Sequence, residues 1–267
     1  MSKADYSLEI VENRDTRYEE YEELVLRRDQ LLKKTGSIQI AYTKEFGELL
    51  CRNFELKIEC IKKKKTISYC RRRMNRGLPI DTARMQEEIE HEMTLYNDQL
   101  KEMLYENESA KKAVKSNKYE VIRAKKIYKR LVKLLHPDIN KKTAENADLM
   151  ELWERIAVAY QKTDVDALND LEVLVKRGME ALGDDSFELQ LDDIEERIER
   201  IENQINEILT TEPYTYRELL FDEEKKNEFK EKLQAEYDDF EQYLENLTKT
   251  LDEMLCEGEV KIVWQMN

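Results

Sequence analysis

The sequence His136-Pro137-Asp138 places an imidazole, a proline ring and a carboxylate at three successive positions. As a bare tripeptide it is weak evidence, because average residue usage produces it by chance in roughly one or two of every hundred chains of this length. Pro137 cannot continue a helix, since its nitrogen carries no hydrogen and its ring clashes with the preceding turn. The flanking residues therefore decide between a functional loop and a histidine that merely ends a helix, where the helix dipole favours a cation.

The segment leading into the motif is expected to be a strongly basic helix. Residues 118–135 carry seven basic side chains against the one acid Glu120, a net charge of +6 in a chain whose net charge is −14. The basic residues nearest the motif are Lys125, Lys126, Lys129, Arg130 and Lys133. The apolar residues Tyr128, Leu131, Val132 and Leu135 recur at helical steps on another face. A helix with one basic and one apolar face is therefore predicted to end at His136.

A second helix is expected from about residue 144 to 161, after the polar loop DINKKTAEN. Leu149, Trp153, Ile156 and Tyr160 line one of its sides, with the small Ala159 beside them. The two helices, joined by a loop that a proline fixes, should form an antiparallel pair.

These residues resemble the J domain of DnaJ-type co-chaperones, and the wider chain resembles bacterial J-domain-containing proteins with flanking helical arms. In that family a helix of pattern Tyr-basic-basic-Leu-small ends one residue before His-Pro-Asp. It packs on a helix of pattern Phe-x-x-Ile-x-x-Ala-Tyr. Here Tyr128-Lys129-Arg130-Leu131-Val132 matches the first pattern, and Trp153, Ile156, Ala159 and Tyr160 match the second, with Trp in the aromatic position.

The chain departs from the family at the start of this unit. A full J domain begins with a short helix of type Tyr-x-x-Leu-Gly-Val, whereas here Lys118-Tyr119-Glu120-Val121-Ile122 runs directly into the basic helix. That first helix is missing, or a neighbouring arm takes over its packing. The cysteine-rich zinc module and the Gly/Phe linker of classical DnaJ proteins are also absent from the sequence, so their handling of substrate does not carry over.

The resemblance implies a co-chaperone rather than an enzyme, with no catalytic residue, metal or cofactor of its own. The basic helix would dock on an acidic surface of a DnaK-type heat-shock ATPase, steered by complementary charge and weakened by salt. The expected partner contacts are Lys125, Lys126, Lys129, Arg130, Lys133, His136, Pro137, Asp138 and the accessory Asn140. The motif would contact the partner near its interdomain linker and trigger ATP hydrolysis there. The residues expected to pack the pair are Tyr128, Leu131, Leu135, Trp153, Ile156 and Tyr160.

Two other functions are consistent with the residues. The chain could be a structural coiled-coil adaptor whose J-like unit is inactive, which the missing first helix favours. It could also contact nucleic acid or a ribosome through the basic stretch at residues 57–76. A solvated helix face explains that stretch better, because aromatic side chains for base stacking are poorly interleaved with its lysines and arginines.

The composition sets the fold class expected around this unit. Charged residues make up 39% of the 267 residues, while Gly and Pro number only 6 and 3, which points to long helices and an all-α fold. Helices are predicted over residues 15–34, ending near Gly36, over 37–76 and over 82–107. Gly77 and the capping residue Asp81 separate the last two. Two long helices joined by a short turn should form an antiparallel hairpin.

The C-terminal part shows a heptad pattern and is strongly acidic. Residues 184–256 hold 24 acidic and 8 basic side chains. Apolar residues at heptad spacing run from Phe187 and Leu191 through Ile194, Ile198, Ile201, Ile205 and Ile208, and again from Phe229 to Met254. A second antiparallel hairpin is the simplest prediction, although each arm could instead pair with another chain in a homodimer.

Three consecutive domains follow from these patterns. They are an N-terminal helical hairpin arm (1–110), a J-domain-like unit (111–183) and an acidic coiled-coil hairpin (184–267), with the arms available for client or partner binding. Four cysteines, at 51, 60, 70 and 256, lack the spacing of a zinc site. No apolar run is long enough to span a bilayer. A cytoplasmic protein that does not associate with membranes is expected.

Overall fold

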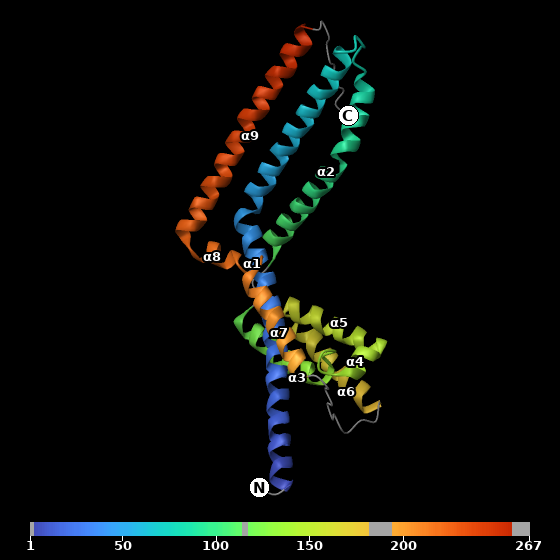
Figure 1. Cartoon of the computed structure of the whole chain (residues 1–267), viewed down its shortest axis with the longest axis vertical. Coiled ribbons are helices and arrows are strands. Elements are labelled where there is room, and N and C mark those ends of the chain that lie inside the picture. Colours follow the sequence, from blue (N-terminus) through green and yellow to red (C-terminus); the bar gives the residue numbers. More distant parts are fainter. Residues whose placement is uncertain (1–2, 114–116, 182–193, 258–267) are drawn as a thin grey trace. The chain divides into compact units, whose positions relative to one another are not determined.

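The computed structural model describes residues 3–113, 117–181 and 194–257, and these residues form nine helices and no strand (Figure 1). The all-α prediction is therefore confirmed for the described residues. The helices are α1 (Lys3–Met74), α2 (Thr82–Lys112), α3 (Lys118–Leu135), α4 (Lys141–Glu145), α5 (Ala147–Lys162), α6 (Val165–Ala181), α7 (Ile194–Thr210), α8 (Tyr216–Phe221) and α9 (Glu223–Glu257).

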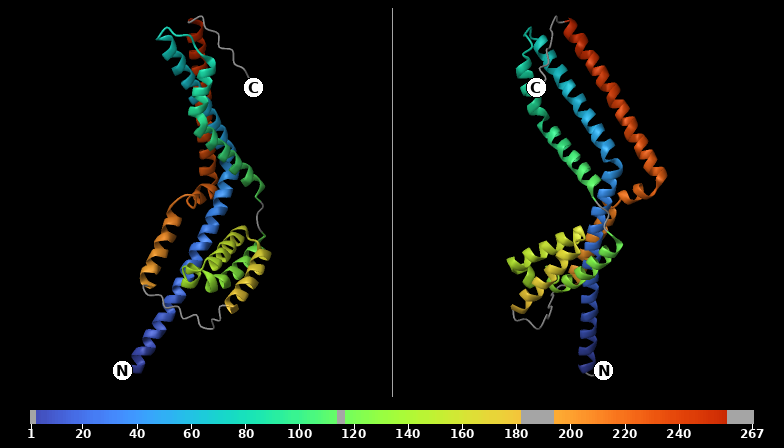
Figure 2. Two further views of the ribbon diagram at one scale, coloured as in Figure 1. Left: turned by 90° about the vertical axis from the view of Figure 1, so that its right-hand side faces the viewer. Right: turned by 180° about the vertical axis from the view of Figure 1, so that it is seen from behind.

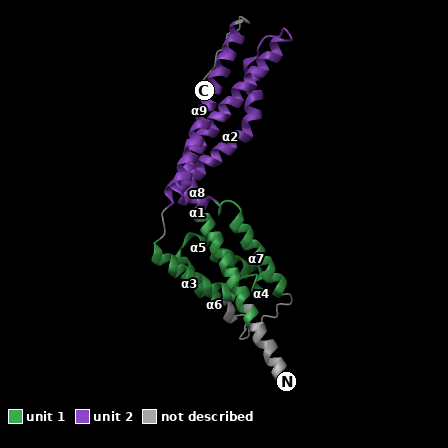
Figure 3. Cartoon of the chain, turned by 60° about the vertical axis from the view of Figure 1, so that its left-hand side comes forward, with its two compact units in different colours: residues 1–37, 114–215 green, residues 38–113, 216–267 purple. Residues whose placement is uncertain are grey.

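The chain divides into two compact units, each built from two separate stretches of sequence (Figure 3). Unit 1 comprises Met1–Ser37 and Val114–Thr215, and unit 2 comprises Ile38–Ala113 and Tyr216–Asn267. Helix α1 contributes to both units. This division differs from three consecutive domains at 1–110, 111–183 and 184–267, because helices α1 and α9 pack with segments far away in sequence.

Unit 1 contains the helices around the His-Pro-Asp motif. Helices α3, α5 and α6 pack against one another, and α1 and α7 complete the apolar core. From α1 this core receives Tyr21, Val25 and Leu26, and from α7 it receives Ile198, Ile201 and Ile205. The alternation of apolar and charged positions on α7 is what buries these isoleucines while its glutamates remain exposed.

Unit 2 is built mainly from the second half of α1 together with α2 and α9 (Figure 2). Helices α1 and α2 form the predicted antiparallel hairpin, since Arg72 of α1 pairs with Glu88 near the start of α2. At the other end of the hairpin, Glu48 lies 3.5 Å from Lys111. The Asp81 side chain accepts a hydrogen bond from the Arg84 amide and caps α2, as predicted.

The prediction that a helix ends near Gly36 is wrong, because α1 runs through this residue without a break. A glycine inside a helix costs only about 1 kcal/mol relative to alanine, and no proline follows this one. Ser37, a residue type that often caps helices, instead donates its hydroxyl to the Lys33 carbonyl. The predicted break at Gly77 is found: α1 ends at Met74, and Gly77 follows with a φ of +62°, a conformation that glycine adopts more easily than other residues.

Helices α7 and α9 do not form a hairpin with each other. They belong to different units, and each buries its apolar seam there: Ile201 in the core of unit 1 and Leu251 in that of unit 2. A heptad pattern identifies which face of a helix is buried but not which helix covers it. The first two seam positions, Phe187 and Leu191, lie outside the described residues.

Candidate functional site

The chain turns sharply at the His-Pro-Asp loop, by which we mean residues 136–140. Helix α3 ends at Leu135, and His136 adopts the extended backbone (φ −63°, ψ 126°) favoured before a proline. The His136 amide still donates to the Val132 carbonyl and closes the last helical turn. Its own carbonyl accepts from the amides of Ile139 (2.9 Å) and Asn140 (2.7 Å), so the chain reverses direction within a few residues.

Asn140 holds this loop together from within. Its side-chain nitrogen donates to the Leu134 carbonyl at 2.9 Å, and its side-chain oxygen accepts from the Lys142 amide at 3.0 Å. The second bond caps α4. The expected accessory partner contact therefore has a buried side chain whose donor and acceptor are both used inside the unit.

The His136 side chain is only 3% exposed and packs edge-on against Trp153, with ring centroids 4.5 Å apart. Its Nδ1 accepts from the Asp138 amide at 3.0 Å. In the neutral imidazole Nε2 must then carry the proton, and Nε2 lies 3.5 Å from an Asp29 carboxylate oxygen. The same Nε2 lies 3.2 Å from a guanidinium nitrogen of Arg28. The motif's histidine thus faces α1 and is not open to solvent.

A buried ion pair on α1 carries the charges that face the loop. Asp29 accepts two bonds from Arg28, at 2.9 and 3.1 Å, and a third from the Tyr128 hydroxyl at 2.8 Å. Burial opposes the charged form of Asp29, but the hydrogen bond from His136 and the charge of Arg28 outweigh it and lower the carboxyl's pKa. Burial likewise opposes the charge on Arg28, yet Asp29 and Asp138 raise its pKa.

Asp138 is held by both α1 and α7. Arg28 donates to its carboxylate at 2.8 Å and also reaches Gln204 of α7 at 3.2 Å. The Asp138 carbonyl accepts from the Tyr21 hydroxyl at 3.2 Å and from Arg197 of α7 at 3.4 Å. The side chain of Asp138 nevertheless remains 40% exposed, so the loop's carboxylate is bound on one side and open on the other.

The residues predicted to pack the helix pair all lie in the core of unit 1. They are Tyr128, Leu131, Leu135, Trp153, Ile156 and Tyr160. The rings of Tyr128 and Tyr160 stack with centroids 3.8 Å apart. Tyr21 and Val25 of α1 share this core, so α1 packs on the helix pair.

The five predicted docking cations fall into two groups. Lys125, Lys126 and Lys129 are exposed and have no ion-pair partner among the described residues. Arg130 instead forms two hydrogen bonds, of 2.7 and 2.8 Å, with Glu172 of α6. Lys133 lies 2.6 Å from Glu22 of α1. Three of the five predicted docking cations therefore carry a charge that no acidic side chain among the described residues balances.

A cavity of about 320 Å³ lies over the loop, lined in part by Arg28, His136, Pro137 and Asp138. Just beyond it, the Lys33 ammonium donates to the Tyr160 carbonyl at 2.5 Å and lies 4.0 Å from the centroid of that residue's ring. Burial lowers the pKa of Lys33 to about 8 and raises that of Tyr160 to about 12.

Sequence reasoning missed the residues of α1 and α7 that surround the loop. Arg28 and Arg197 lie 110 and 59 positions from Asp138 and belong to no motif. One signal was available in the sequence: Arg28 and Asp29 fall at helical steps from Tyr21 and Val25, on an otherwise apolar face. Charged residues at such positions need partners, but the sequence does not identify them.

The basic stretch at residues 57–76 is partly neutralised within unit 2. Lys65 pairs with Glu92, and Arg72 pairs with Glu88, both on α2. Lys57, Lys62 and Lys64 remain exposed. The acids of α2, rather than those of α9, therefore compensate the two paired cations.

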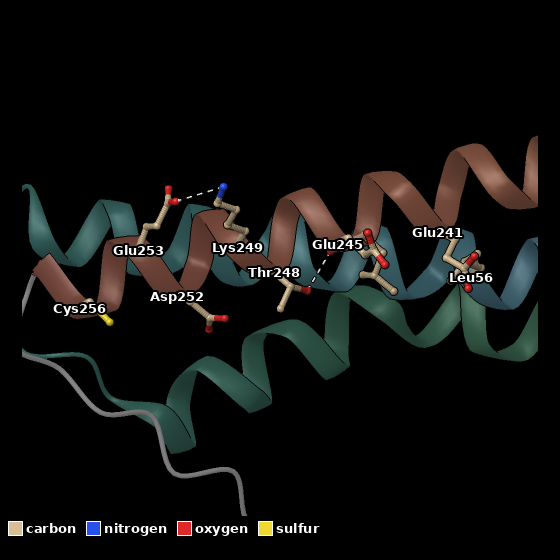
Figure 4. Close-up of a pocket in the computed structure, with 9 residues that line it drawn as sticks. Leu56, Glu241, Glu245, Thr248, Lys249, Asp252, Glu253 and Cys256 are labelled. Atoms are coloured by element: carbon tan, nitrogen blue, oxygen red, sulfur yellow. Dashed lines mark hydrogen bonds and ion pairs between the residues drawn. The ribbon is translucent and has the colours of Figure 1, made fainter.

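A second cavity, of about 830 Å³, forms a groove along α9 in unit 2 (Figure 4). Leu56 of α1 and Leu244 of α9 give it an apolar floor. Its charged lining residues are Glu241, Glu245, Lys249, Asp252 and Glu253, and the last of these lies 3.9 Å from Lys249. We call this feature the α9 groove; it is apolar at its base and acidic at its rim.

Comparison with family models, with curated proteins and with solved structures found no match to this chain. None of the described helices is long and apolar enough to cross a membrane. Among the described residues, no group of three or more His, Cys, Asp or Glu side chains is arranged to hold a metal ion.

Proposed function

We propose that this chain is a co-chaperone that docks on a DnaK-type heat-shock ATPase and stimulates its hydrolysis of ATP. One observation carries the proposal: the His-Pro-Asp loop directly follows a helix whose outer face keeps Lys125, Lys126 and Lys129 exposed and unpaired. A purely structural helix pair requires neither the motif nor an uncompensated basic face. A cytoplasmic location goes with this proposal.

In this mechanism, the lysines of α3 bind an acidic surface of the partner, and this places the His-Pro-Asp loop in contact with the partner. Attraction between exposed charges accelerates encounter and weakens as salt increases. The hydrolytic chemistry belongs to the partner, so the loop acts through binding and needs no general base of its own. Asp138, with its partly exposed carboxylate, is the loop group best placed to meet a cation on the partner.

The helical arms would supply a surface for a client or a second partner, and the α9 groove fits this role best. Four acids and one lysine surround its apolar floor. Charge complementarity therefore favours a basic amphipathic helical segment as the occupant. Leu244→Asp should weaken binding of a lysine-rich amphipathic peptide, as measured by fluorescence anisotropy, whereas the exposed Asn246→Asp should not. Equal binding by both variants would remove the groove from this role.

The decisive experiment measures single-turnover ATP hydrolysis by a DnaK-type ATPase with and without this protein. We expect His136→Gln and Asp138→Asn to reduce the stimulation by at least about tenfold. The matched control is His91→Gln, which alters the chain's other histidine, an exposed residue of α2. Circular dichroism should verify that each variant is folded, because His136 is buried.

The structural-adaptor alternative is favoured by one observation, the burial of His136 against α1. It predicts no stimulation by any form of the protein, including the loop-released variants described below. Stimulation that survives both His136→Gln and Asp138→Asn would mean that other residues are responsible. Binding to RNA that depends on Lys57, Lys62 and Lys64 would support the nucleic-acid alternative instead.

A further inference from the structure

We infer that α1 regulates the proposed docking surface by covering it with the same kind of contact that a partner would make. This inference rests on the proposed co-chaperone function and concerns the control of that same site. We call the covering contacts the clasp; they are made by Tyr21, Glu22 and Arg28 of α1 and Arg197 of α7.

The clasp is complementary in charge to the docking surface. Glu22 pairs with Lys133, one of the cations of α3, at 2.6 Å. Arg28 pairs with the Asp138 carboxylate at 2.8 Å. Glu22 of α1 thus neutralises one predicted docking cation, and Arg28 of α1 neutralises the carboxylate of the motif. A partner using an acidic surface and a cation must displace both.

Arg28 of the clasp and its neighbour Asp29 also cover the motif's histidine. Arg28 and Asp29 lie 3.2 and 3.5 Å from His136 Nε2, and the ring is 3% exposed. A partner cannot reach this ring while α1 remains in place. Pro137 and Asp138 are only half-buried, so the loop is closed at His136 and partly open beside it.

The helix pair also has packing contacts in which the clasp takes no part. Tyr128 and Trp153 keep α3 and α5 together, with ring centroids 5.7 Å apart, and Arg130 ties α3 to Glu172 of α6. Releasing Asp138 from Arg28 therefore leaves the loop's supports in place. Arg28 stays positioned after release as well, because Asp29 binds it through two nitrogens. These features describe a contact that opens and recloses.

A ligand that binds only the open form has its apparent affinity reduced by the fraction of molecules that are open. If about one molecule in ten is open, full release strengthens apparent binding by up to roughly tenfold. A co-chaperone closed in this way would have low activity until something competes for α1.

The test uses the full chain and two independent readouts. Backbone hydrogen exchange at residues 138–140 reports opening of the loop, whether or not the protein is a co-chaperone. Single-turnover ATP hydrolysis by a DnaK-type ATPase, titrated with the protein, reports docking. The release variants are Arg28→Gln and Glu22→Gln. The matched controls are Arg27→Gln and Glu23→Gln, which are exposed neighbours on the same helix.

We expect both release variants to exchange faster at the loop and to reach half-maximal stimulation at a concentration several-fold below that of the wild type. The controls should match the wild type in both readouts. Because Arg28 also pairs with the buried Asp29, Arg28→Gln carries a risk of unfolding. Tyr21→Phe removes only the hydroxyl that donates to the Asp138 carbonyl, and it should act in the same direction with a smaller effect.

Unchanged loop exchange in folded release variants would overturn the clasp itself. Faster exchange with unchanged stimulation would show that the contact exists but regulates nothing. If the loop opens and no form of the protein stimulates the ATPase, the co-chaperone function fails, and the regulatory inference fails with it. The exchange data distinguish this last outcome from the first.

Discussion

Asp29 is the residue on which the charges around the loop depend. It is buried, and it accepts hydrogen bonds from Arg28 and Tyr128 while facing His136. Neutralising it leaves Asp138, whose side chain is partly exposed, as the remaining acidic partner of Arg28 among the described residues. Its place on an otherwise apolar helix face marks Asp29 as a charge that needs partners. Two of those partners, Tyr128 and His136, lie far away in sequence and are brought to it only by the fold.

Asp29→Asn should destabilise unit 1 by about 3 kcal/mol at neutral pH, the usual order for breaking a buried ion pair. The folded-state pKa of Asp29 is lowered, so its contribution is present above the ordinary Asp range and is lost as the pH falls through that lowered value. Urea unfolding followed by circular dichroism measures this. Asp170→Asn, at an exposed site of α6, is the control and should change stability little. Equal stability of both variants would contradict the assigned pairing.

Two glycines within α1 should respond oppositely to the same substitution. An added Cβ at Gly36 meets nothing within 4 Å, whereas one at Gly47 would lie 2.6 Å from the buried Asn107 side-chain oxygen. Gly36→Ala should stabilise by up to about 1 kcal/mol through helix propensity. Gly47→Ala should destabilise by about 1 kcal/mol or more, since overpacking outweighs that gain. Comparable stabilisation by both in urea unfolding would rule out the close approach of α2.

At the scale of the elements, local patterns and the hairpin of the consecutive helices α1 and α2 were predicted well, whereas contacts between helices far apart in sequence were not. The break at Pro137, the cap at Asp81 and the burial of Tyr128 and Trp153 each depend on residues a few positions apart. The clasp depends on Arg28 meeting Asp138 across 110 positions. Helical periodicity cannot report such contacts, because it gives the buried face without naming the element that covers it.

The outer face of α3 should govern the salt dependence of docking. Replacing Lys125, Lys126 and Lys129 together by Gln should weaken binding to a DnaK-type ATPase by about tenfold at low salt and flatten the salt dependence. Surface plasmon resonance at several salt concentrations measures both effects. Lys57, Lys62 and Lys64, exposed on the part of α1 in unit 2, provide a control with the same change in charge. If the control loses as much affinity, net charge rather than the α3 face is responsible.

At the scale of the whole molecule, unfolding measured on the full chain should show an alkaline maximum in stability. Burial lowers the pKa of Lys33 to about 8, so the folded state releases this proton before the unfolded state does. Stability should therefore rise with pH between about 8 and 9. From about 9 the rise is opposed, because burial raises the pKa of the Cys51, Cys60 and Cys70 thiols and the unfolded state loses these protons first. Burial raises the pKa of Tyr21, Tyr128 and Tyr160, so above about 10 the folded state retains protons that the unfolded state loses. Stability should then fall.

Urea unfolding at a series of alkaline pH values measures this profile. Lys33→Met should abolish the rise between about pH 8 and 9 while preserving the fall at higher pH. A variant that still shows the rise would assign the titration to another group. The control is Lys34→Met, at the neighbouring exposed lysine, and it should leave the pH profile of stability unchanged.

The shared helix α1 has a consequence for the order in which the protein is made. In its N-terminal half, Arg28 bonds to Gln204, which follows 176 positions later in the chain. In its C-terminal half, Asn53 donates to the carbonyl of Leu233, which follows 180 positions later. At about 5–20 residues per second on the ribosome, these late partners emerge roughly ten to forty seconds after the residues they cover. The apolar stripe of α1 therefore spends that time uncovered by α7 and α9.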